Sequence, residues 1–385
     1  MVPVRSGKTQ PAQLDPLSEG PIWCAAIPLT RSGDPVGGLA SPYPSGVAPV
    51  SPRAGHEDAL SALVDLVQDD LEACNRTIVA RMDSPVALIP QLAAHIVAAG
   101  GKRLRPLLTL AAARLCGYPG PAGGARHVDL AACVEFIHTA TLLHDDVVDE
   151  SQLRRGLASA NAVFGNKASV LVGDFLFARA FQLMVADGSL RVLEILSRAA
   201  ATIAEGEVLQ LITQNDLTTT ERRYLDVVEG KTAALFAAAC QVGAVVADRP
   251  RPEENALATY GMKLGTAFQL VDDALDYAAD QVTLGKTVGD DFREGKITFP
   301  VLVAYAAGDA PERAFWQRTI EQMEQTEADL AEAMALMTRR DAIPATIGRA
   351  MRFAQEAKAA LDVFPDTPIR RALVAVADYT VQRAR

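Results

Sequence analysis

The spacing of apolar residues constrains the fold of this chain more than any other feature. From about His56 onward, apolar residues recur three and four positions apart, as in HEDALSALVDLVQDDLEAC and LAACVEFIHTATLLHDD. This spacing is typical of helices that bury one face, and runs of β-branched or aromatic alternation are missing from the sequence. Prolines stand where helices would begin or connect. We therefore predict one all-α domain over residues 56–385, built from roughly ten or more helices.

Residues 1–55 precede this pattern and differ from it in composition. They are dense in Pro, Gly and Ser, as in SPYPSGVAPVSP, and show no sustained period. Such a segment buries too little apolar surface to fold, so we expect a disordered extension. It contains no compact apolar signal-peptide core, and the chain has no run of about 18 uninterrupted apolar residues. We expect a cytoplasmic protein without a transmembrane segment.

Charge and cysteine content narrow the range of ligands. The five cysteines are scattered and form no CxxC pair, which argues against a disulfide framework or a zinc site. A formal net charge of -10 argues against nucleic-acid binding, because phosphates are neutralised by a basic face. An anionic ligand would therefore need local positive charge or a metal ion.

Two aspartate motifs with the same spacing lie in apolar helical segments. LLHDDVVDESQLRRG holds Asp145, Asp146 and Asp149, and FQLVDDALDY, about 130 residues later, holds Asp272, Asp273 and Asp276. On a helix such carboxylates share one face and repel each other by roughly 0.2–0.5 kcal/mol per pair. A solvated acidic face would explain one motif, whereas two suggest acidic walls on either side of a cavity. Oxygen-only ligands favour Mg²⁺, with a phosphorylated ligand between the walls.

Basic residues accompany the acidic motifs. They occur in GGKRLRP, in the arginine pair after the first motif, in EGKTAALF and in LGKTVGDDFREGK. Arginine and lysine are the side chains that hold phosphate oxygens. Any one of them is readily explained as a solvated surface cation, but the set together points to a phosphorylated ligand.

Two other phosphate chemistries fit less well. The GKT tripeptides do not form a P-loop, because Leu225 and Asp280 occupy the positions that require glycine. The pair His144-Asp145 is similar to the metal pair of some phosphohydrolases, but these enzymes need further histidine ligands and the chain has only five histidines. We therefore set both readings aside.

The motifs GGKRLRP, FIHTATLLHDDVVDESQLRRG, EGKTAALF, FQLVDDALDY and LGKTVGDDFREGKITFP occur in this order. In sequence and order they resemble those of the trans-polyprenyl diphosphate synthases, the long-chain relatives of farnesyl and geranylgeranyl diphosphate synthases. The resemblance runs from about residue 57 to the C-terminus. It implies an isoprenoid synthase fold around a deep central cavity, usually in a homodimer, with more than one Mg²⁺ between the acidic helices. The implied activity is a prenyltransferase that repeatedly condenses isopentenyl diphosphate onto an allylic diphosphate such as farnesyl diphosphate.

The same resemblance implies a role for each motif residue. The implied Mg²⁺ ligands are Asp145, Asp149 and Asp272, assisted by Asp146, Asp273 and Asp276. Positions matching the allylic diphosphate site are Arg154, Lys231, Thr232, Gln269, Lys286 and Lys296. Positions matching the isopentenyl diphosphate site are Lys102, Arg105, His138 and Arg155. The residues expected to drive ionisation are Arg154 and Lys231, which oppose the charge of the departing diphosphate, and Asp145, Asp149 and Asp272, which act through the Mg²⁺ that they are implied to hold. No side-chain nucleophile or general base is expected.

Small residues one helical turn before the first motif bear on product length. Thr141 and Ala140 lie four and five positions before Asp145, where short-chain relatives resemble one another in carrying a bulky aromatic. Small side chains would leave a tunnel open at this depth, which implies a product of about C40 to C50, suited to a quinone side chain. Candidates for the tunnel floor, or for ordinary core packing, are Cys133, Val134, Ile137, Phe177, Phe181 and Met184.

Three alternatives remain open at this point. A shorter-chain, geranylgeranyl-type synthase would share all five motifs. A terpene cyclase of the same fold usually carries an Asn/Ser/Glu metal motif on the second wall and lacks the GGK and KT elements. A regulatory subunit of a heteromeric synthase commonly loses one or both acidic motifs, and both are intact in this sequence.

Overall fold

The structure is a computed structural model that describes residues 57–98, 101–120, 124–154, 156–277 and 288–383. The extension 1–55 and two residues with expected roles, Arg155 and Lys286, lie outside these ranges. Within them the chain is helical apart from one short hairpin, so the prediction of an all-α fold is confirmed.

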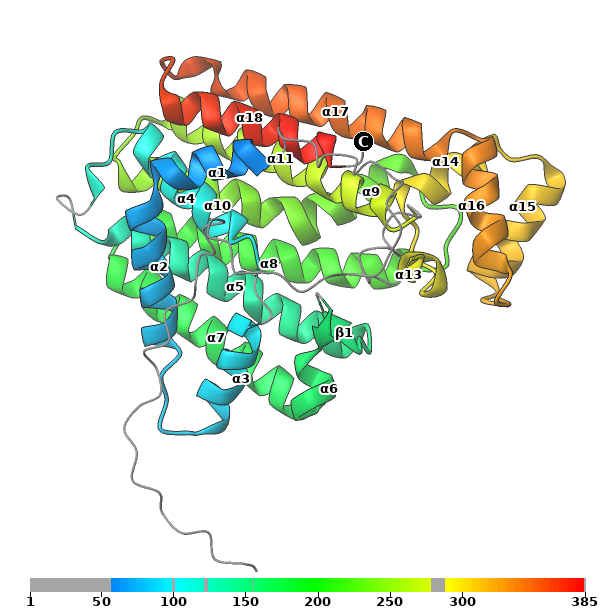
Figure 1. Ribbon diagram of the computed structural model, residues 1–385, viewed down its shortest axis with the longest axis horizontal. Coiled ribbons are helices and arrows are strands. Elements are labelled where there is room, and N and C mark those ends of the chain that lie inside the picture. The colour runs from blue at the N-terminus through cyan, green and yellow to red at the C-terminus, as the bar shows by residue number, and fades with distance from the viewer. Residues whose placement is uncertain (1–56, 99–100, 121–123, 155, 278–287, 384–385) are drawn as a thin grey trace, which may run out of the picture. The chain divides into compact units, whose positions relative to one another are not determined.

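The first part of the described chain leads up to and past the first acidic motif (Figure 1). Its elements are α1 (Glu57–Leu66), α2 (Gln68–Arg81), α3 (Leu88–Ala98), α4 (Leu104–Leu115), α5 (Arg126–Val148), β1 (Leu153–Arg154), β2 (Leu157–Ala158), α6 (Ala160–Phe164) and α7 (Asn166–Asp187). Strands β1 and β2 pair antiparallel, with Leu153 opposite Ala158 and Arg154 opposite Leu157.

The second part carries the second acidic motif and the C-terminal helices. Its elements are α8 (Leu190–Thr213), α9 (Glu221–Val228), the π-helical turn η2 (Glu229–Ala233), α10 (Ala234–Val246), α11 (Arg251–Leu275), α13 (Asp290–Arg293), α14 (Phe299–Ala307), α15 (Ala310–Trp316), the π-helical turn η3 (Gln317–Glu321), α16 (Asp329–Arg339), α17 (Ala342–Ala360), the 3-10 turn η4 (Leu361–Val363) and α18 (Pro368–Gln382).

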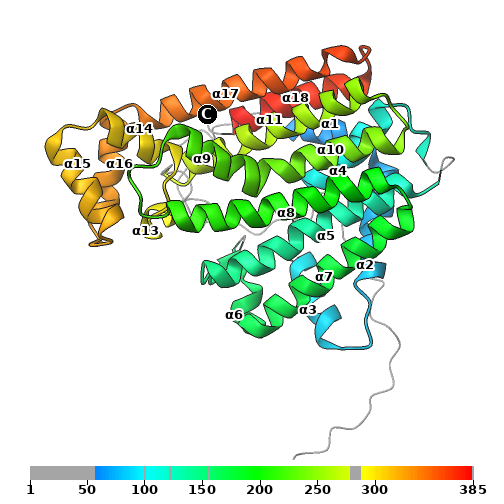
Figure 2. The ribbon, with the colours of Figure 1, turned by 180° about the vertical axis from the view of Figure 1, so that it is seen from behind.

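The long helices pack against one another around a shared apolar core. Helix α5 packs along α7 and α4, α10 packs along α4 and α11, and α11 packs along α17. Helices α8, α10 and α11 run side by side in both views (Figures 1 and 2). Phe136, Phe236 and Tyr260 are fully buried in this core, and the Tyr260 hydroxyl donates to the Leu373 carbonyl oxygen at 2.8 Å. This bond ties α11 to α18, so the C-terminal helix is held beside the helix of the second acidic motif.

Both acidic motifs lie at the C-terminal ends of long helices. Asp145 and Asp146 are in the last turn of α5 and Asp149 is its C-cap. The second motif ends α11 in the same way, with its third aspartate at the C-cap. Carbonyl groups at a helix C-terminus carry partial negative charge, so a carboxylate there is unfavourable. The fold thus adds helix dipoles to the repulsion within each motif, and a bound cation would relieve both.

One described helix, α7, is long and apolar enough to cross a membrane by length and composition, and 39% of its apolar window is buried. A core helix of a soluble protein has the same composition. Because α7 packs along α5 and also contacts α6 and α8, its sequence alone does not indicate a membrane span.

Candidate functional site

A cavity of about 740 Å³ brings the sequence motifs together. Its walls come from α4, α5, β1, α8, η2, α10 and α11, from the segment between α13 and α14, and from the residue after α18. The predicted residues that line it are Lys102, Arg105, His138, Thr141, Asp145, Asp149, Arg154, Lys231, Thr232, Gln269, Asp272 and Lys296. Carboxylates from both acidic motifs therefore share one cavity with the basic residues, although more than 100 positions separate the motifs in sequence.

The carboxylate of Asp146 is buried beneath this cavity and holds an arginine. Only 2% of its surface is exposed, and Arg154 donates to both of its oxygens at 2.6–3.0 Å. Arg154 is positioned by the β1–β2 hairpin, and the Asn161 side chain donates to the Asp146 carbonyl oxygen at 3.0 Å. Asp146 thus orients Arg154 toward the cavity, whereas its neighbour Asp145 lines the cavity itself.

The other carboxylates of the first motif face lysines. The Lys231 ammonium lies 4.0 Å from Asp145 Oδ2, and Lys296 donates to Asp149 Oδ2 at 3.3 Å. Burial raises the pKa of Asp145, and the charge of Asp149 adds to this effect against the opposing charge of Lys231. Burial lowers the pKa of Lys296, but the charges of Asp149, Asp291 and Glu294 raise it above its ordinary value. In the ligand-free protein, Lys231 and Lys296 therefore partly neutralise Asp145 and Asp149. A bound diphosphate could accept hydrogen bonds from the same two lysines.

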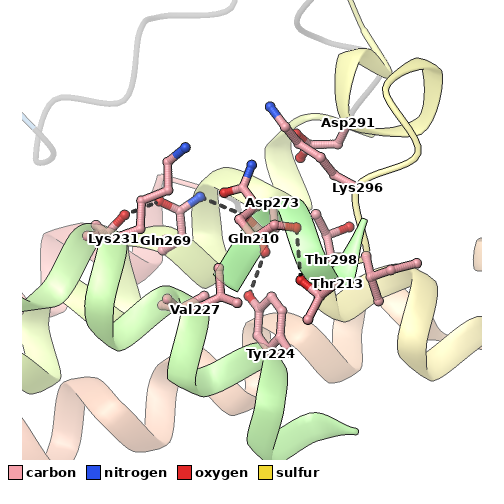
Figure 3. Close-up of a pocket in the computed structure, with 13 residues that line it drawn as sticks. Gln210, Thr213, Tyr224, Val227, Lys231, Gln269, Asp273, Asp291, Lys296 and Thr298 are labelled. Atoms are coloured by element: carbon pink, nitrogen blue, oxygen red, sulfur yellow. Dashed lines mark hydrogen bonds between the residues drawn. The ribbon is translucent and has the colours of Figure 1, made fainter. Parts of the chain in front are cut away.

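A chain of hydrogen bonds fixes the second motif (Figure 3). Thr232 Oγ1 donates to Gln269 Oε1 at 2.9 Å, Gln269 Nε2 donates to Asp273 Oδ1 at 2.8 Å, and the Tyr224 hydroxyl donates to Asp273 Oδ2 at 2.5 Å. These residues line a smaller pocket of about 120 Å³. Two of the expected contacts to the allylic diphosphate, Thr232 and Gln269, are therefore held in place by the motif.

Burial makes the two inner carboxyls of this motif weak acids. Burial raises the pKa of Asp273 to about 6, against the hydrogen bonds from Tyr224 and Gln269. Burial likewise raises the pKa of Asp276 to about 6, although the backbone N–H of Asp291 donates to it at 3.1 Å. The remaining carboxylate, Asp272, is 43% exposed and lines the large cavity. Asp272 is thus the member of this motif best placed for a metal ion, while Asp273 and Asp276 support the wall.

The donor chemistry of the two walls fits Mg²⁺. Among the described residues, no three His, Cys, Asp or Glu side chains already form a metal-type cluster. Such a cluster is not required, because Mg²⁺ commonly uses one or two carboxylates and completes its shell with water and substrate phosphates. Asp145, Asp149 and Asp272 place carboxylate oxygens on one cavity, and they stand at helix ends that disfavour negative charge.

The described residues of the predicted isopentenyl diphosphate site, Lys102 before α4, Arg105 on α4 and His138 on α5, all line the cavity. Arg105 donates to His138 Nε2 at 3.0 Å, and its guanidinium lies 4.5 Å from the centre of the Phe236 ring. Lys102 donates to the Tyr379 hydroxyl at 3.0 Å. Two cations and an imidazole thus line the same cavity as the lysines beside the first acidic motif.

The two small residues expected to set product length differ in position. Thr141 is half-buried and lines the cavity, whereas Ala140 is fully buried in the core. The role of either residue stays a prediction, but Thr141 is the one whose side chain borders open space.

Three cavity-lining residues lie outside the five motifs and were missed by sequence reasoning, namely Glu135, Glu207 and Arg383. Phe236 and Phe268 also line the cavity; they lie within motifs but were assigned no role. Arg383 follows α18, donates to Asp272 Oδ1 at 2.8 Å, and lies 4.3 Å from the centre of the Phe268 ring. No local pattern distinguishes it from a surface arginine. Glu207 carried a weak signal, since it is a carboxylate beside a glycine in an otherwise apolar helical segment.

The raised pKa values predict a pH dependence of stability. Burial raises the pKa of Glu207 to about 7, and the values for Asp273 and Asp276 are about 6. Between their unfolded pKa values near 4 and these folded values, the folded protein binds more protons, so stability falls as pH rises from about 5 to about 8. His127 is buried, and burial lowers its pKa. This single group acts in the opposite direction, because its contribution to stability increases as pH rises.

Thermal unfolding measured without ligand at pH 6.0 and pH 8.0 should therefore give the higher Tm at pH 6.0, by at least about 3 °C. Addition of Mg²⁺ with inorganic diphosphate should raise Tm at pH 8.0 and shrink the difference, because bound cations favour the ionised carboxylates. An equal or higher ligand-free Tm at pH 8.0 would contradict this electrostatic description.

Comparisons with known proteins show the family of this chain. Octaprenyl diphosphate synthase of Escherichia coli (strain K12) is 50% identical over 326 residues, which cover 85% of this chain and 99% of that protein. A crystal structure of a decaprenyl diphosphate synthase from Rhodobacter capsulatus has a TM-score of 0.81 and 54% identity, and the match covers 85% of this chain and 99% of that one. A polyprenyl synthase from Caulobacter crescentus CB15, complexed with calcium and isoprenyl diphosphate, has a TM-score of 0.81 and 53% identity, with 85% and 98% covered. The family model for polyprenyl synthetase matches residues 86–337, and the chain therefore belongs to the polyprenyl synthetase family.

Proposed function

We propose that this enzyme is a Mg²⁺-dependent trans-polyprenyl diphosphate synthase that adds isopentenyl diphosphate repeatedly to an allylic diphosphate. The observation that carries the proposal is the single cavity on which Asp145, Asp149 and Asp272 meet two separate groups of basic residues. One group, Arg154, Lys231 and Lys296, lies beside aspartates of the first acidic motif, and the other comprises Lys102 before α4, Arg105 on α4 and His138 on α5. Two basic groups suit two diphosphate substrates, because each diphosphate needs its own counter-charges.

The allylic diphosphate would lie between the two acidic helix ends. Asp145, Asp149 and Asp272 would hold Mg²⁺ there, which when bound would neutralise the charge of the departing diphosphate. Lys231, Arg154 and Lys296 would donate to the phosphate oxygens, while Thr232 and Gln269 fix the orientation of the wall. The result is an allylic carbocation and a bound diphosphate.

Isopentenyl diphosphate would be held through Lys102, Arg105 and His138. Its terminal double bond then attacks the carbocation, and loss of a proton gives a product five carbons longer with a new trans double bond. No protein base is assigned to this step, since the released diphosphate is available to accept the proton. The apolar residues that line the cavity, among them Phe236 and Phe268, exclude the water that would quench the cation.

We propose that the product is a long chain of about C40 to C50. Support comes from the small side chain of Thr141 on the cavity wall and from the octaprenyl and decaprenyl diphosphate synthases that the chain matches. A quinone side chain is the destination that such a length suits.

Purified protein incubated with Mg²⁺, farnesyl diphosphate and isopentenyl diphosphate should release inorganic diphosphate and form a ladder of prenyl diphosphates ending at one long product. Chromatography of the dephosphorylated products measures activity and chain length together. Absence of elongation with geranyl, farnesyl and geranylgeranyl diphosphate would refute the proposed function, and a product that stops at about C20 would refute only the proposed length.

The enzyme is further proposed to be a cytoplasmic homodimer that associates through α7 and α8. These helices expose many large apolar side chains, namely Val170, Leu171, Phe181, Val185, Leu190, Val208, Leu211 and Ile212. Apolar faces of this kind are typical of subunit interfaces. The four described cysteines are buried thiols, which suits a reducing compartment.

The double variant Leu171→Glu/Val185→Glu should sediment as a monomer under conditions in which the unchanged protein sediments as a dimer. Two charges placed on the α7 face would remain desolvated in an apolar interface, which costs several kcal/mol. Val363→Glu, an equally exposed apolar position on η4, serves as the control and should leave the dimer intact. A monomeric unchanged protein, or an unaffected double variant, would rule out this interface.

A further inference from the structure

Two glycines bring the helix of Glu207 and the turn of Lys231 into backbone contact. Gly206 lies on α8 and Gly230 lies on η2. A Cβ atom added to Gly206 would lie 2.5 Å from the Lys231 backbone nitrogen, and one added to Gly230 would lie 3.1 Å from Gly206 Cα. Only glycine permits this approach. The side chains that follow the two glycines, Glu207 and Lys231, must therefore share the same part of the cavity wall.

Within the cavity, the ammonium group of Lys231 lies closer to Glu207 than to Asp145. The Lys231 ammonium donates to Glu207 Oε2 at 2.6 Å and stands 4.0 Å from Asp145 Oδ2. Lys231 is thus bound to Glu207 and is next to Asp145 without a hydrogen bond to it. Residue 231 also lies in a π-helical turn, a distortion that occurs frequently at functional sites.

The second oxygen of Glu207 has no hydrogen-bond partner among the described residues. Oε1 is buried although the side chain as a whole is 26% exposed. A carboxylate kept only for stability would ordinarily satisfy both oxygens. Burial, together with the nearby charges of Asp145 and Asp149, raises the pKa of Glu207 to about 7, so the ion pair with Lys231 is maintained at a cost in stability. Such a cost is expected of a residue retained for function.

We propose that Glu207 is a positioning residue that holds the ammonium group of Lys231 away from Asp145 and directs it toward the allylic diphosphate. An ammonium group has three N–H donors, and the bond to Glu207 fixes the direction of the other two. One of these can then reach a phosphate oxygen while Asp145 remains available to Mg²⁺. The inference rests on the proposed function and adds to it a residue outside all five motifs.

The consequence of losing Glu207 follows from the same distances. Without it, Asp145 is the nearest anion, at 4.0 Å, so Lys231 would pair with a carboxylate that the metal needs. Diphosphate departure would slow, and more Mg²⁺ would be required to displace the lysine. Substrate binding through the remaining basic residues would change little.

A double-mutant cycle tests the proposal in the elongation assay with farnesyl diphosphate and isopentenyl diphosphate. Glu207→Gln, which keeps an acceptor oxygen, should lower kcat about 10-fold, and Glu207→Ala about 100-fold. The KM for farnesyl diphosphate should change less than about 3-fold, and the Mg²⁺ concentration for half-maximal activity should rise about 3-fold or more. Lys231→Ala combined with Glu207→Gln should be no slower than Lys231→Ala alone, because Glu207 acts through Lys231.

Glu205→Gln is the matched control, since Glu205 is exposed on the same helix and does not line the cavity; it should retain unchanged kinetics. Thermal unfolding should show the Glu207 variants folded, with a Tm equal to or above that of the unchanged protein. Losses that multiply in the double variant, or a Mg²⁺ dependence unaltered by Glu207→Gln, would overturn the proposal. If the unchanged protein shows no elongation, the proposed function itself has failed.

Discussion

Asparagine in place of Asp145 is expected to abolish turnover without unfolding the protein. Asp145 lines the cavity, and burial raises the pKa of its carboxyl group. The carboxylate lies in the last turn of α5, so the helix dipole disfavours its charge as well. These costs are reasonable only for a group that gains a cation in the working enzyme. Loss of a metal ligand at the departing diphosphate should lower kcat by about 10³-fold or more.

The stability of the same variant separates a metal ligand from a structural carboxylate. Asp145→Asn removes a desolvated charge and its repulsion with Asp149, so its Tm without Mg²⁺ should equal or exceed that of the unchanged protein. Asp146→Asn is the informative contrast, because it breaks the buried bidentate pair with Arg154 and should cost about 1–3 kcal/mol. Diphosphate release and thermal unfolding measured on both variants give the comparison. Turnover of Asp145→Asn within about 10-fold of the unchanged enzyme would remove Asp145 from the metal site.

The helical fold and the identity of the two walls were predictable because both depend on short-range patterns. Apolar spacing of three and four residues predicts each helix, and a DDxxD spacing places its first and last carboxylates one helical turn apart on one face. That the two motifs face one cavity was an inference from their pairing, and the structure places Asp145 and Asp272 on the same lining.

The contacts that the sequence did not predict are those between distant segments. Arg383 reaches Asp272 because α18 packs against α11, and no pattern near residue 383 encodes that packing. Glu207 meets Lys231 because two glycines allow α8 and η2 to touch. Membership of a DDxxD motif also did not reveal that Asp146 is buried under the hairpin with Arg154. Each of these contacts depends on which side chains meet where two elements pack together. The spacing of residues along one sequence does not contain that information.

Phenylalanine in place of Thr141 is expected to shorten the product from about C40 to C50 to about C20 when farnesyl diphosphate is the primer. Thr141 lines the cavity one helical turn, about 5.4 Å, before Asp145 on α5. An aromatic ring at that point would fill the path of the growing chain just beyond the diphosphate. The first condensations should proceed normally, since the side chains that hold both diphosphates are unchanged.

Ala140→Phe is the matched comparison for this prediction. Ala140 is fully buried, so a phenylalanine there must displace packed core residues and should cost about 1–3 kcal/mol of stability. If both variants shorten the product, the tunnel follows the α5 face that carries both residues. Shortening by Ala140→Phe alone would place the tunnel on the core side of α5, and unchanged products from both folded variants would remove α5 from the control of chain length. Chromatography of the dephosphorylated products, with Tm measured for each variant, decides among these outcomes, because product length and stability respond to different neighbours of the same helix.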